Sequence, residues 1–320
     1  MNAVIATPHQ HPKWSLRPHH WGRLDAHKIR IRIILAGLCR TDIQSMTGQR
    51  MIQEGRILGH EAAGIIEEIG AHIQHQSQIK GLEVGCRVAF FPFLPCQTCP
   101  ACLSGERIDR CWKPQVVGMD VDGAFATYID LPLEVIFRVD QTLPWEALAY
   151  AEPVAAALSA LEVHEELTEQ QSLGLLGSGR IATLTERILV EIAGKKVERI
   201  HENTPCNSLD ALIETRATEA TLKQAIDVLK PGGTLFVKSR PSGTVPWPHQ
   251  YLVYKRIRVI GLHYGDFELG LDLMAQGTLD VRDCWGKVFP FTSEGIEKAL
   301  EIEALGLETE GKLFFKIGVE

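Results

Sequence analysis

The chain is 320 residues long and 45% hydrophobic, and its 40 Asp and Glu outnumber its 33 Lys and Arg, which gives a formal net charge of −7. This acidic balance offers no basic face to nucleic acid or to an anionic membrane, so we expect a small-molecule partner. No cationic stretch followed by an apolar one opens the chain, and nowhere do about 18 apolar residues follow one another, so we expect a cytoplasmic protein. A chain of this length is expected to form two domains.

The N-terminal part of the chain predicts a β-rich domain. Near its start are four histidines without helical or hairpin spacing, which we expect to be solvated side chains rather than a metal site: His9, His11, His19 and His20. Between residues 28 and 137, short β-rich segments alternate with glycine and proline, as in HKIRIRIILAG and GAFATYIDL. The pattern changes near residue 145, where we expect a domain boundary.

The second half of the chain alternates between helix and strand patterns, which predicts a parallel sheet. The segments in chain order are a long helix (WEALAYAEPVAAALSALEVHEEL), a buried strand (SLGLLG), a helix (RIATLTERILVEIAG), two strands (KVERIHEN, LDALIET), a helix (ATLKQAIDVLK), and the turn PGG before TLFVKS. The predicted fold class is therefore α/β.

Four of the eight cysteines lie within sixteen residues, in the pattern C-x2-C-x2-C-x8-C: Cys96, Cys99, Cys102 and Cys111. Disulfides rarely persist in a reducing compartment, whereas four thiolates at this spacing can surround one Zn²⁺ tetrahedrally at about 2.3 Å. We expect a structural zinc site that holds a lobe with little apolar content. The alternative is that these cysteines are redox-active or merely buried.

Two further motifs, AGLCRTD and LGHEAAG, carry a thiol (Cys39), an imidazole (His60) and carboxylates on flanking loops. Mixed ligands that leave one position open are what a catalytic zinc ion requires, because the substrate must reach the metal. Each motif alone is weak, since a lone histidine or cysteine is more often a core residue.

In its ordered set of motifs, the sequence resembles the zinc-dependent alcohol and polyol dehydrogenases of the medium-chain dehydrogenase/reductase superfamily. The set consists of these two motifs, the cysteine lobe, A-E-P, a glycine-rich turn and L-x-P-G-G. The resemblance implies Cys39 and His60 as catalytic zinc ligands, with Glu61 able to enter the coordination sphere. It implies Thr41 as the hydroxyl that relays the substrate proton, and Arg40 as a contact of the cofactor pyrophosphate.

The resemblance also implies the domain organisation. Residues 1–148 and 286–320 would form a GroES-like β-rich catalytic domain, and residues 149–285 a truncated Rossmann domain with a doubly wound parallel sheet. A homodimer or homotetramer is expected.

The A-E-P motif contains Glu152, which stands where polyol dehydrogenases of this family place a glutamate as third zinc ligand and simple alcohol dehydrogenases a cysteine. A hard oxygen donor makes zinc more Lewis acidic than a second thiolate would. The alternative is that Glu152 only stabilises the start of the helix that contains Pro153.

The segment GLLGSGRIA fits G-x-G-x-x-A at the end of a strand and the start of a helix, where backbone N–H groups can approach a pyrophosphate. The expected cofactor-binding residues are Gly177, Ser178, Gly179, Arg180, Ile181 and Ala182. Glu202 closes the next strand, where an acid binds the adenosine ribose hydroxyls and repels a 2′-phosphate, so NAD is favoured over NADP. His201 and Asn203 could soften this preference, and we expect Arg199 on the other side of the strand.

Two departures from the family pattern bear on function. Gln44 stands where the proton relay usually ends in histidine, so another group or water must take the proton. Only seven residues separate Glu202 from Asp210, where the family inserts a helix, a strand and another helix. The missing strand would lie at the edge of the order 3-2-1-4-5-6, so the cofactor cleft can survive if the connection avoids the glycine turn.

The sequence therefore predicts a zinc-dependent oxidoreductase with one catalytic and one structural Zn²⁺, which moves hydride between NAD(P) and a secondary alcohol of polyol, sugar-alcohol or hydroxy-amino-acid type. The first alternative is a zinc-binding relative that has lost nucleotide binding and serves a non-redox role. The second is an NADPH-linked carbonyl reductase.

Overall fold

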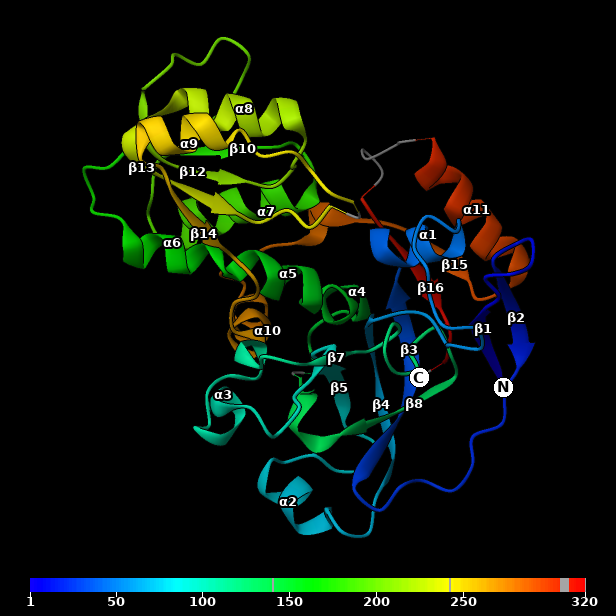
Figure 1. Ribbon diagram of the computed structural model, residues 1–320. Helices are drawn as coiled ribbons and strands as arrows, with labels where there is room; N and C mark the ends of the chain where they lie inside the picture. Colours follow the sequence, from blue (N-terminus) through cyan, green and yellow to red (C-terminus); the bar gives the residue numbers. More distant parts are fainter. Residues whose placement is uncertain (140, 242, 306–310, 320) are drawn as a thin grey trace. The chain divides into compact units, whose positions relative to one another are not determined.

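The computed structural model describes residues 1–139, 141–241, 243–305 and 311–319. The chain forms two compact units (Figure 1). The first contains residues 1–153, 267–275 and 280–320, and the second contains residues 154–266 and 276–279. Helix α10 (Phe267–Ala275) thus belongs to the first unit, whereas the sequence pattern places it with the nucleotide-binding part.

The first unit is built on a seven-stranded sheet with the order β15-β16-β3-β4-β5-β9, in which β8 also pairs with β3. Its strands are β3 (Lys28–Gly37), β4 (Glu61–Ile69), β5 (Arg87–Phe90), β8 (Tyr128–Pro132), β9 (Ile136–Arg138), β15 (Trp285–Pro290) and β16 (Lys312–Lys316). Along β3, Ile29, Ile31 and Ile33 are fully buried, while Arg30 between them pairs with Asp130 on β8. This alternation with period two fixes which face of β3 meets the core.

Smaller elements surround this sheet. They are β1 (Asn2–Ala6) with β2 (Trp14–Pro18), β6 (Phe93–Leu94) with β7 (Gln115–Val116), and the helices α1 (Arg40–Met46), α2 (Gln74–Ile79), α3 (Pro100–Leu103), α4 (Trp145–Ala149) and α11 (Ser293–Ala304). The core of this unit combines the inner face of β3 with residues such as Phe90, Phe125 and Phe315. The GroES-like β-rich architecture expected for this part is observed.

The second unit contains a five-stranded parallel sheet with the order β11-β10-β12-β13-β14. Its strands are β10 (Leu173–Leu176), β11 (Val197–Arg199), β12 (Leu209–Glu214), β13 (Leu229–Val237) and β14 (Arg258–Gly261). In Rossmann numbering this order is 2-1-4-5-6, so the strand absent from the sequence is the edge strand 3, as predicted. Figure 1 shows α8 (Glu219–Val228) and α9 (His249–Lys255) on one face, and α6 (Ala160–Glu166) and α7 (Arg180–Arg187) on the other.

The predicted long helix after residue 145 is divided into α4, α5 (Ala151–Leu158) and α6. Pro153 lacks an N–H group and its ring clashes with a helical turn before it, which accounts for the break between α4 and α5. The predicted PGG turn is an irregularity inside β13, because the pairing passes from Leu209↔Leu229 to Ala211↔Thr234.

The shortened connection between β11 and β12 runs along α8. The backbone N–H groups of Asn207 and Ser208 donate to the carbonyls of Asp227 and Val228, at 3.0 and 2.9 Å. The carbonyl of His201 accepts from Gln224 Nε2 at 2.9 Å. The connection therefore returns to the start of β12 beside α8, and residues 203–209 leave the glycine turn at 177–182 uncovered.

Candidate active site

The first predicted metal site lies where β3 ends and β4 begins. Gly37 pairs with Glu61 across these strands, so Cys39, at the N-cap of α1, faces His60, which precedes β4. Ligand atoms of Cys39, Asp42 and His60 all lie within 4.8 Å of one another. The structure thus assembles the thiol and the imidazole that the sequence assigned to the catalytic zinc.

Asp42 has a role that the sequence did not assign. Its carboxylate accepts hydrogen bonds from the backbone N–H groups of Cys39 (3.1 Å) and Gly59 (3.2 Å), and Oδ1 lies 3.4 Å from His60 Nδ1. Burial lowers the pKa of His60, but Asp42 and Cys39 outweigh it and raise that pKa well above its ordinary value of 6.5. A carboxylate in this position orients a ligating imidazole and leaves Nε2 to face the metal.

Two further predicted ligands, Glu61 and Glu152, are buried, and Glu61 interacts electrostatically with both Glu152 and His60. Neither carboxylate is among the ligand atoms that lie within 4.8 Å of one another in the described part of the chain. Glu61 forms an ion pair with Lys312 on β16, and both side chains are almost fully buried. Burial raises the pKa of Glu61, Lys312 opposes the rise, and the neighbouring Glu152 adds to it. The sequence analysis did not predict that Lys312 would pair with Glu61. The one sign in the sequence is a lysine at the start of the otherwise apolar strand segment KLFFK.

A backbone position without a side chain makes this ion pair possible. A Cβ atom on Gly37 would lie 2.8 Å from Lys312 Cε and 3.0 Å from Glu61 Oε2. A larger residue at the end of β3 would therefore displace the ion pair.

The donor set fits a divalent cation. The carboxylates of Asp42, Glu61 and Glu152 are all buried, and Lys312 pairs with that of Glu61. Isolated buried charge is costly unless it is paired or coordinates a metal. Thiolate, imidazole and carboxylate together are typical of catalytic zinc.

The second predicted metal site is the cysteine lobe around α3. The sulfur atoms of Cys96, Cys99, Cys102 and Cys111 lie within 4.8 Å of one another, and none is in a disulfide. Backbone N–H groups of Cys96 and Trp112 donate to Cys111 Sγ (3.2 Å) and Cys99 Sγ (3.5 Å). Hydrogen bonds from Thr98 lower the pKa of Cys96 to about 5, so a thiolate is available at neutral pH. The residues fit a closed, structural zinc site.

The glycine turn in the second unit connects β10 to α7. Gly177 has φ of +126°, and a Cβ atom there would lie 2.0 Å from Thr215 Oγ1, so only glycine fits. Gly179 is the N-cap of α7, and Ala182 is fully buried against the sheet. A pocket of about 320 Å³ opens beside this turn and is lined by residues that include Gly177, Ser178 and Arg199.

Residues 25–141 match the alcohol dehydrogenase GroES-like domain family. The chain is 25% identical to D-xylulose reductase A of Aspergillus oryzae, over 88% of this chain and 87% of that protein, and 24% identical to sorbitol dehydrogenase of Arabidopsis thaliana, over 88% and 86%. A short chain alcohol dehydrogenase (rspB) from E. coli CFT073, solved with NADH, superposes with a TM-score of 0.84 over 99% of both chains at 20% identity. The chain therefore carries an alcohol dehydrogenase GroES-like domain over residues 25–141, and over most of its length it is similar to zinc-type medium-chain dehydrogenases/reductases.

Four residues expected to contact cofactor or substrate lie in the first turns of α1 and α7. Arg40 and Thr41 form the first turn of α1 directly after Cys39, and Arg180 begins α7. Ile181 follows Arg180 in the first turn of α7. Their cofactor and relay roles stay predictions.

Two residues at the end of β11 differ from the arrangement expected for this family. Glu202 is exposed and is not among the residues that line the pocket, whereas His201 and Arg199 are. Arg199, which we expected on the other side of the strand, donates from Nη1 to the carbonyl of Gly177 at 2.8 Å.

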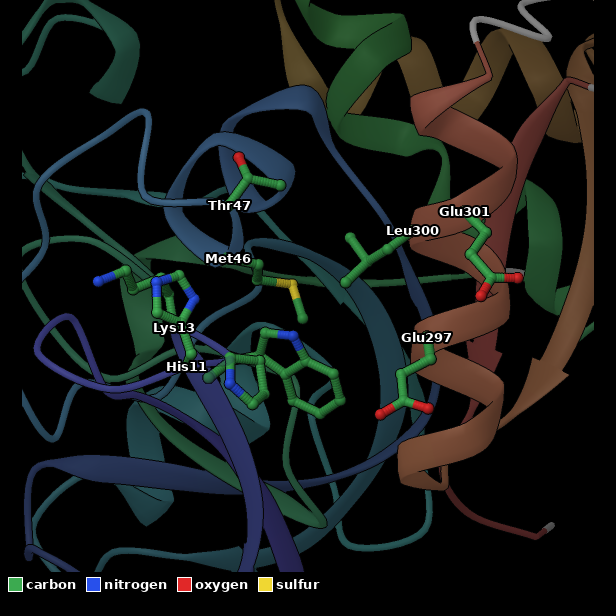
Figure 2. A pocket seen from close by; sticks show the side chains of 9 residues that line it. His11, Lys13, Met46, Thr47, Glu297, Leu300 and Glu301 are labelled. Atoms are coloured by element: carbon green, nitrogen blue, oxygen red, sulfur yellow. The ribbon is translucent and has the colours of Figure 1, made fainter.

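A further hollow, of about 300 Å³, lies in the first unit between β2, the end of α1, and α11 (Figure 2). His11 and Lys13 line one side, and Glu297, Leu300 and Glu301 of α11 line the other. The described part of the chain places none of the four N-terminal histidines in a group of three or more metal-compatible side chains. Of the helices described, none combines the length and apolar content needed to cross a bilayer.

Proposed function

We propose that this protein is a zinc-dependent oxidoreductase that transfers hydride between NAD(P) and a secondary alcohol of polyol, sugar-alcohol or hydroxy-amino-acid type. The observation that carries the proposal is that a thiol, an imidazole and a carboxylate, from Cys39, His60 and Asp42, have ligand atoms within 4.8 Å of one another. Cys39, His60 and Glu152 would hold the ion, with Asp42 orienting the imidazole. The names of the relatives, D-xylulose reductase and sorbitol dehydrogenase, support the substrate class.

Zinc, when bound, supplies Lewis acidity that polarises the substrate oxygen and lowers its pKa. Oxidation of the alcohol would release one proton from oxygen and one hydride from carbon, and NAD(P)⁺ held by the second unit would supply the hydride acceptor. Thr41, in the first turn of α1, would take the proton through its hydroxyl group. Gln44, one helical turn later, cannot change its protonation state, so the proton would pass from Thr41 to water or to another group.

The second unit supports the nucleotide part of the proposal. Ligands of open α/β sheets bind outside the carboxyl ends of the strands, where Gly177 and Gly179 lie. The connection at residues 203–209 runs along α8 and leaves this turn open, which argues against the alternative of lost nucleotide binding. Assembly into a homodimer or homotetramer belongs to the proposal, and gel filtration with light scattering would measure it.

The experiment combines metal analysis with turnover. We expect two zinc ions per chain, and oxidation of xylitol, sorbitol or a related polyol with NAD⁺ or NADP⁺. Cys39→Ser should retain the fold, contain one zinc ion and lose turnover, whereas the matched control Cys206→Ser, at an exposed position, should retain both zinc ions and full activity. Normal activity in Cys39→Ser would refute the assignment of the metal.

A further inference from the structure

The pocket beside the glycine turn has an unusual charge for a site expected to bind NAD. It is lined by two guanidinium groups, one imidazole and two hydroxyls, from Arg199, Arg216, His201, Ser178 and Thr221, and no carboxylate lines it. Its volume of about 320 Å³ has room for a ribose bearing a phosphate group. The pocket lies at the carboxyl end of β10 and β11, where Rossmann domains bind the adenosine half of the cofactor.

One wall of the pocket is rigid and nearly neutral. Arg199 donates to the carbonyl of Gly177 at 2.8 Å and to Glu186 Oε2 from both Nε (3.0 Å) and Nη2 (2.6 Å). The Glu186 carboxylate balances much of the charge on Arg199. This ion pair therefore braces the glycine turn and supplies little net attraction for an anion.

Arg216 lines the same pocket from the loop between β12 and α8. The loop is fixed locally, because Thr221 Oγ1 donates to the carbonyl of Arg216 at 2.6 Å and Thr218 caps α8. The side chain of Arg216 is exposed, and within the described part of the chain it has no ion pair. Its positive charge is thus available to a ligand in the pocket that His201 also lines.

The carboxylate that would repel a phosphate lies outside this pocket. The turn after β11 is held by two hydrogen bonds of His201, whose N–H donates to Thr204 Oγ1 (3.0 Å) and whose carbonyl accepts from Gln224 (2.9 Å). In this turn His201 lines the pocket, while Glu202 is exposed and does not. The sequence argument for NAD depended on Glu202 facing the ribose.

We propose that this pocket binds the 2′-phosphate of NADP(H), and that Arg216, assisted by His201, determines the preference for NADP(H) over NAD(H). The inference rests on the proposed function, because it specifies the cofactor of that same site. Guanidinium groups bind phosphate oxygens with two parallel charge-assisted hydrogen bonds, and an arginine near the ribose is the usual partner of a 2′-phosphate. The phosphate would lie between Arg216 and His201, with the hydroxyl of Ser178 beside the glycine turn.

The test measures binding without turnover. The binding of NADPH and NADH is titrated by their fluorescence, and the binding of 2′,5′-ADP and 5′-AMP by calorimetry. Each titration is made with the wild type, Arg216→Ala, Arg216→Lys and the matched control Lys196→Ala. Lys196 is exposed and directly precedes β11, at the end of the strand away from the pocket. Lys196→Ala removes one positive charge, as Arg216→Ala does. Since both positions of change are on the surface, the three variants should fold, which circular dichroism would check.

We expect the wild type to bind NADPH at least about tenfold more tightly than NADH, and 2′,5′-ADP more tightly than 5′-AMP. Arg216→Ala should weaken the binding of NADPH and of 2′,5′-ADP by about ten- to a hundredfold, and the binding of NADH by less than about threefold. Arg216→Lys should have an intermediate effect, and Lys196→Ala should bind all four nucleotides as the wild type does.

Two outcomes would overturn the inference, and they separate it from the proposed function. NADH binding as tightly as NADPH, or an equal loss of both in Arg216→Ala, refutes the 2′-phosphate site but leaves a nucleotide-dependent enzyme. Absence of binding by all four nucleotides refutes both.

Discussion

The ion pair between Lys312 and Glu61 gives the sharpest test of how buried charge is neutralised beside the predicted metal site. We consider Lys312→Met, which keeps the length of the side chain and removes its charge. In the wild type the two side chains are 3% and 1% exposed, so water cannot replace the lost ammonium group. Glu61 would remain buried beside Glu152, whose negative charge already raises the pKa of Glu61.

Removing one partner of a buried ion pair costs about 3–5 kcal/mol, because the other charge stays unpaired. We therefore expect Lys312→Met to lower the free energy of unfolding by this amount when zinc is chelated. The loss should be smaller with zinc bound, since the cation partly replaces the ammonium group. The assay is urea unfolding followed by circular dichroism, with and without a chelator.

Two further variants isolate the pair. Lys316→Met removes an exposed lysine from the same strand and should change stability by less than about 0.5 kcal/mol. In the double variant Lys312→Met/Glu61→Gln, most of the loss should be recovered, because no unpaired charge is left. A cost below about 1 kcal/mol for Lys312→Met, or a double variant no more stable than the single one, would refute the argument.

Three other perturbations test separate parts of the molecule. Cys99→Ser should reduce the zinc content from two ions per chain to one and lower the thermal midpoint while nucleotide affinity is kept, as metal analysis and calorimetry would show. Gly177→Ala places a methyl group 2.0 Å from Thr215 Oγ1 in a backbone conformation that side chains rarely adopt, and should abolish nucleotide binding in a fluorescence titration while zinc content stays at two. The carboxylate of Asp210 accepts hydrogen bonds from Ser172 and Lys230. Burial raises the pKa of Asp210, but these two partners outweigh burial, so the pKa is lowered. The ionised carboxylate therefore stabilises the folded protein above about pH 4, and this stabilisation is lost as the pH falls through the lowered pKa. In Asp210→Asn this loss of stability at acid pH should disappear, and the free energy of unfolding near pH 7 should fall by about 1 kcal/mol, because the ion pair is partly exposed. Urea unfolding from pH 7 to pH 2 would measure both effects. The same acid dependence of stability in the wild type and the variant would contradict the assignment.

Local patterns in the sequence predict much of the fold. Isoleucines at every second position of β3 specify a strand with one buried face, and the four clustered cysteines predict a metal lobe without help from distant residues. The count of residues between Glu202 and Asp210 shows that strand 3 is missing, because so short a connection cannot contain a further helix and strand. Each of these conclusions depends on spacing along the chain alone.

Other features depend on which distant segments meet. Pairing of β16 with β3 brings Lys312 to Glu61, and the apolar segment KLFFK carries no sign of that partner. The turn after β11 decides that His201 rather than Glu202 lines the nucleotide pocket, and hydrogen bonds to α8 and Thr204 set that turn. The periodicity after residue 145 also predicts a single helix, although Pro153 interrupts it.

The sequence by itself thus determined the ligand types, the order of the elements and the missing strand, since spacing and residue chemistry are local properties. Only the tertiary structure decided the charge around each ligand. Electrostatic interactions and burial depend on distances in space, and the groups that neutralise Glu61, orient His60 and line the nucleotide pocket come from segments far apart in the chain.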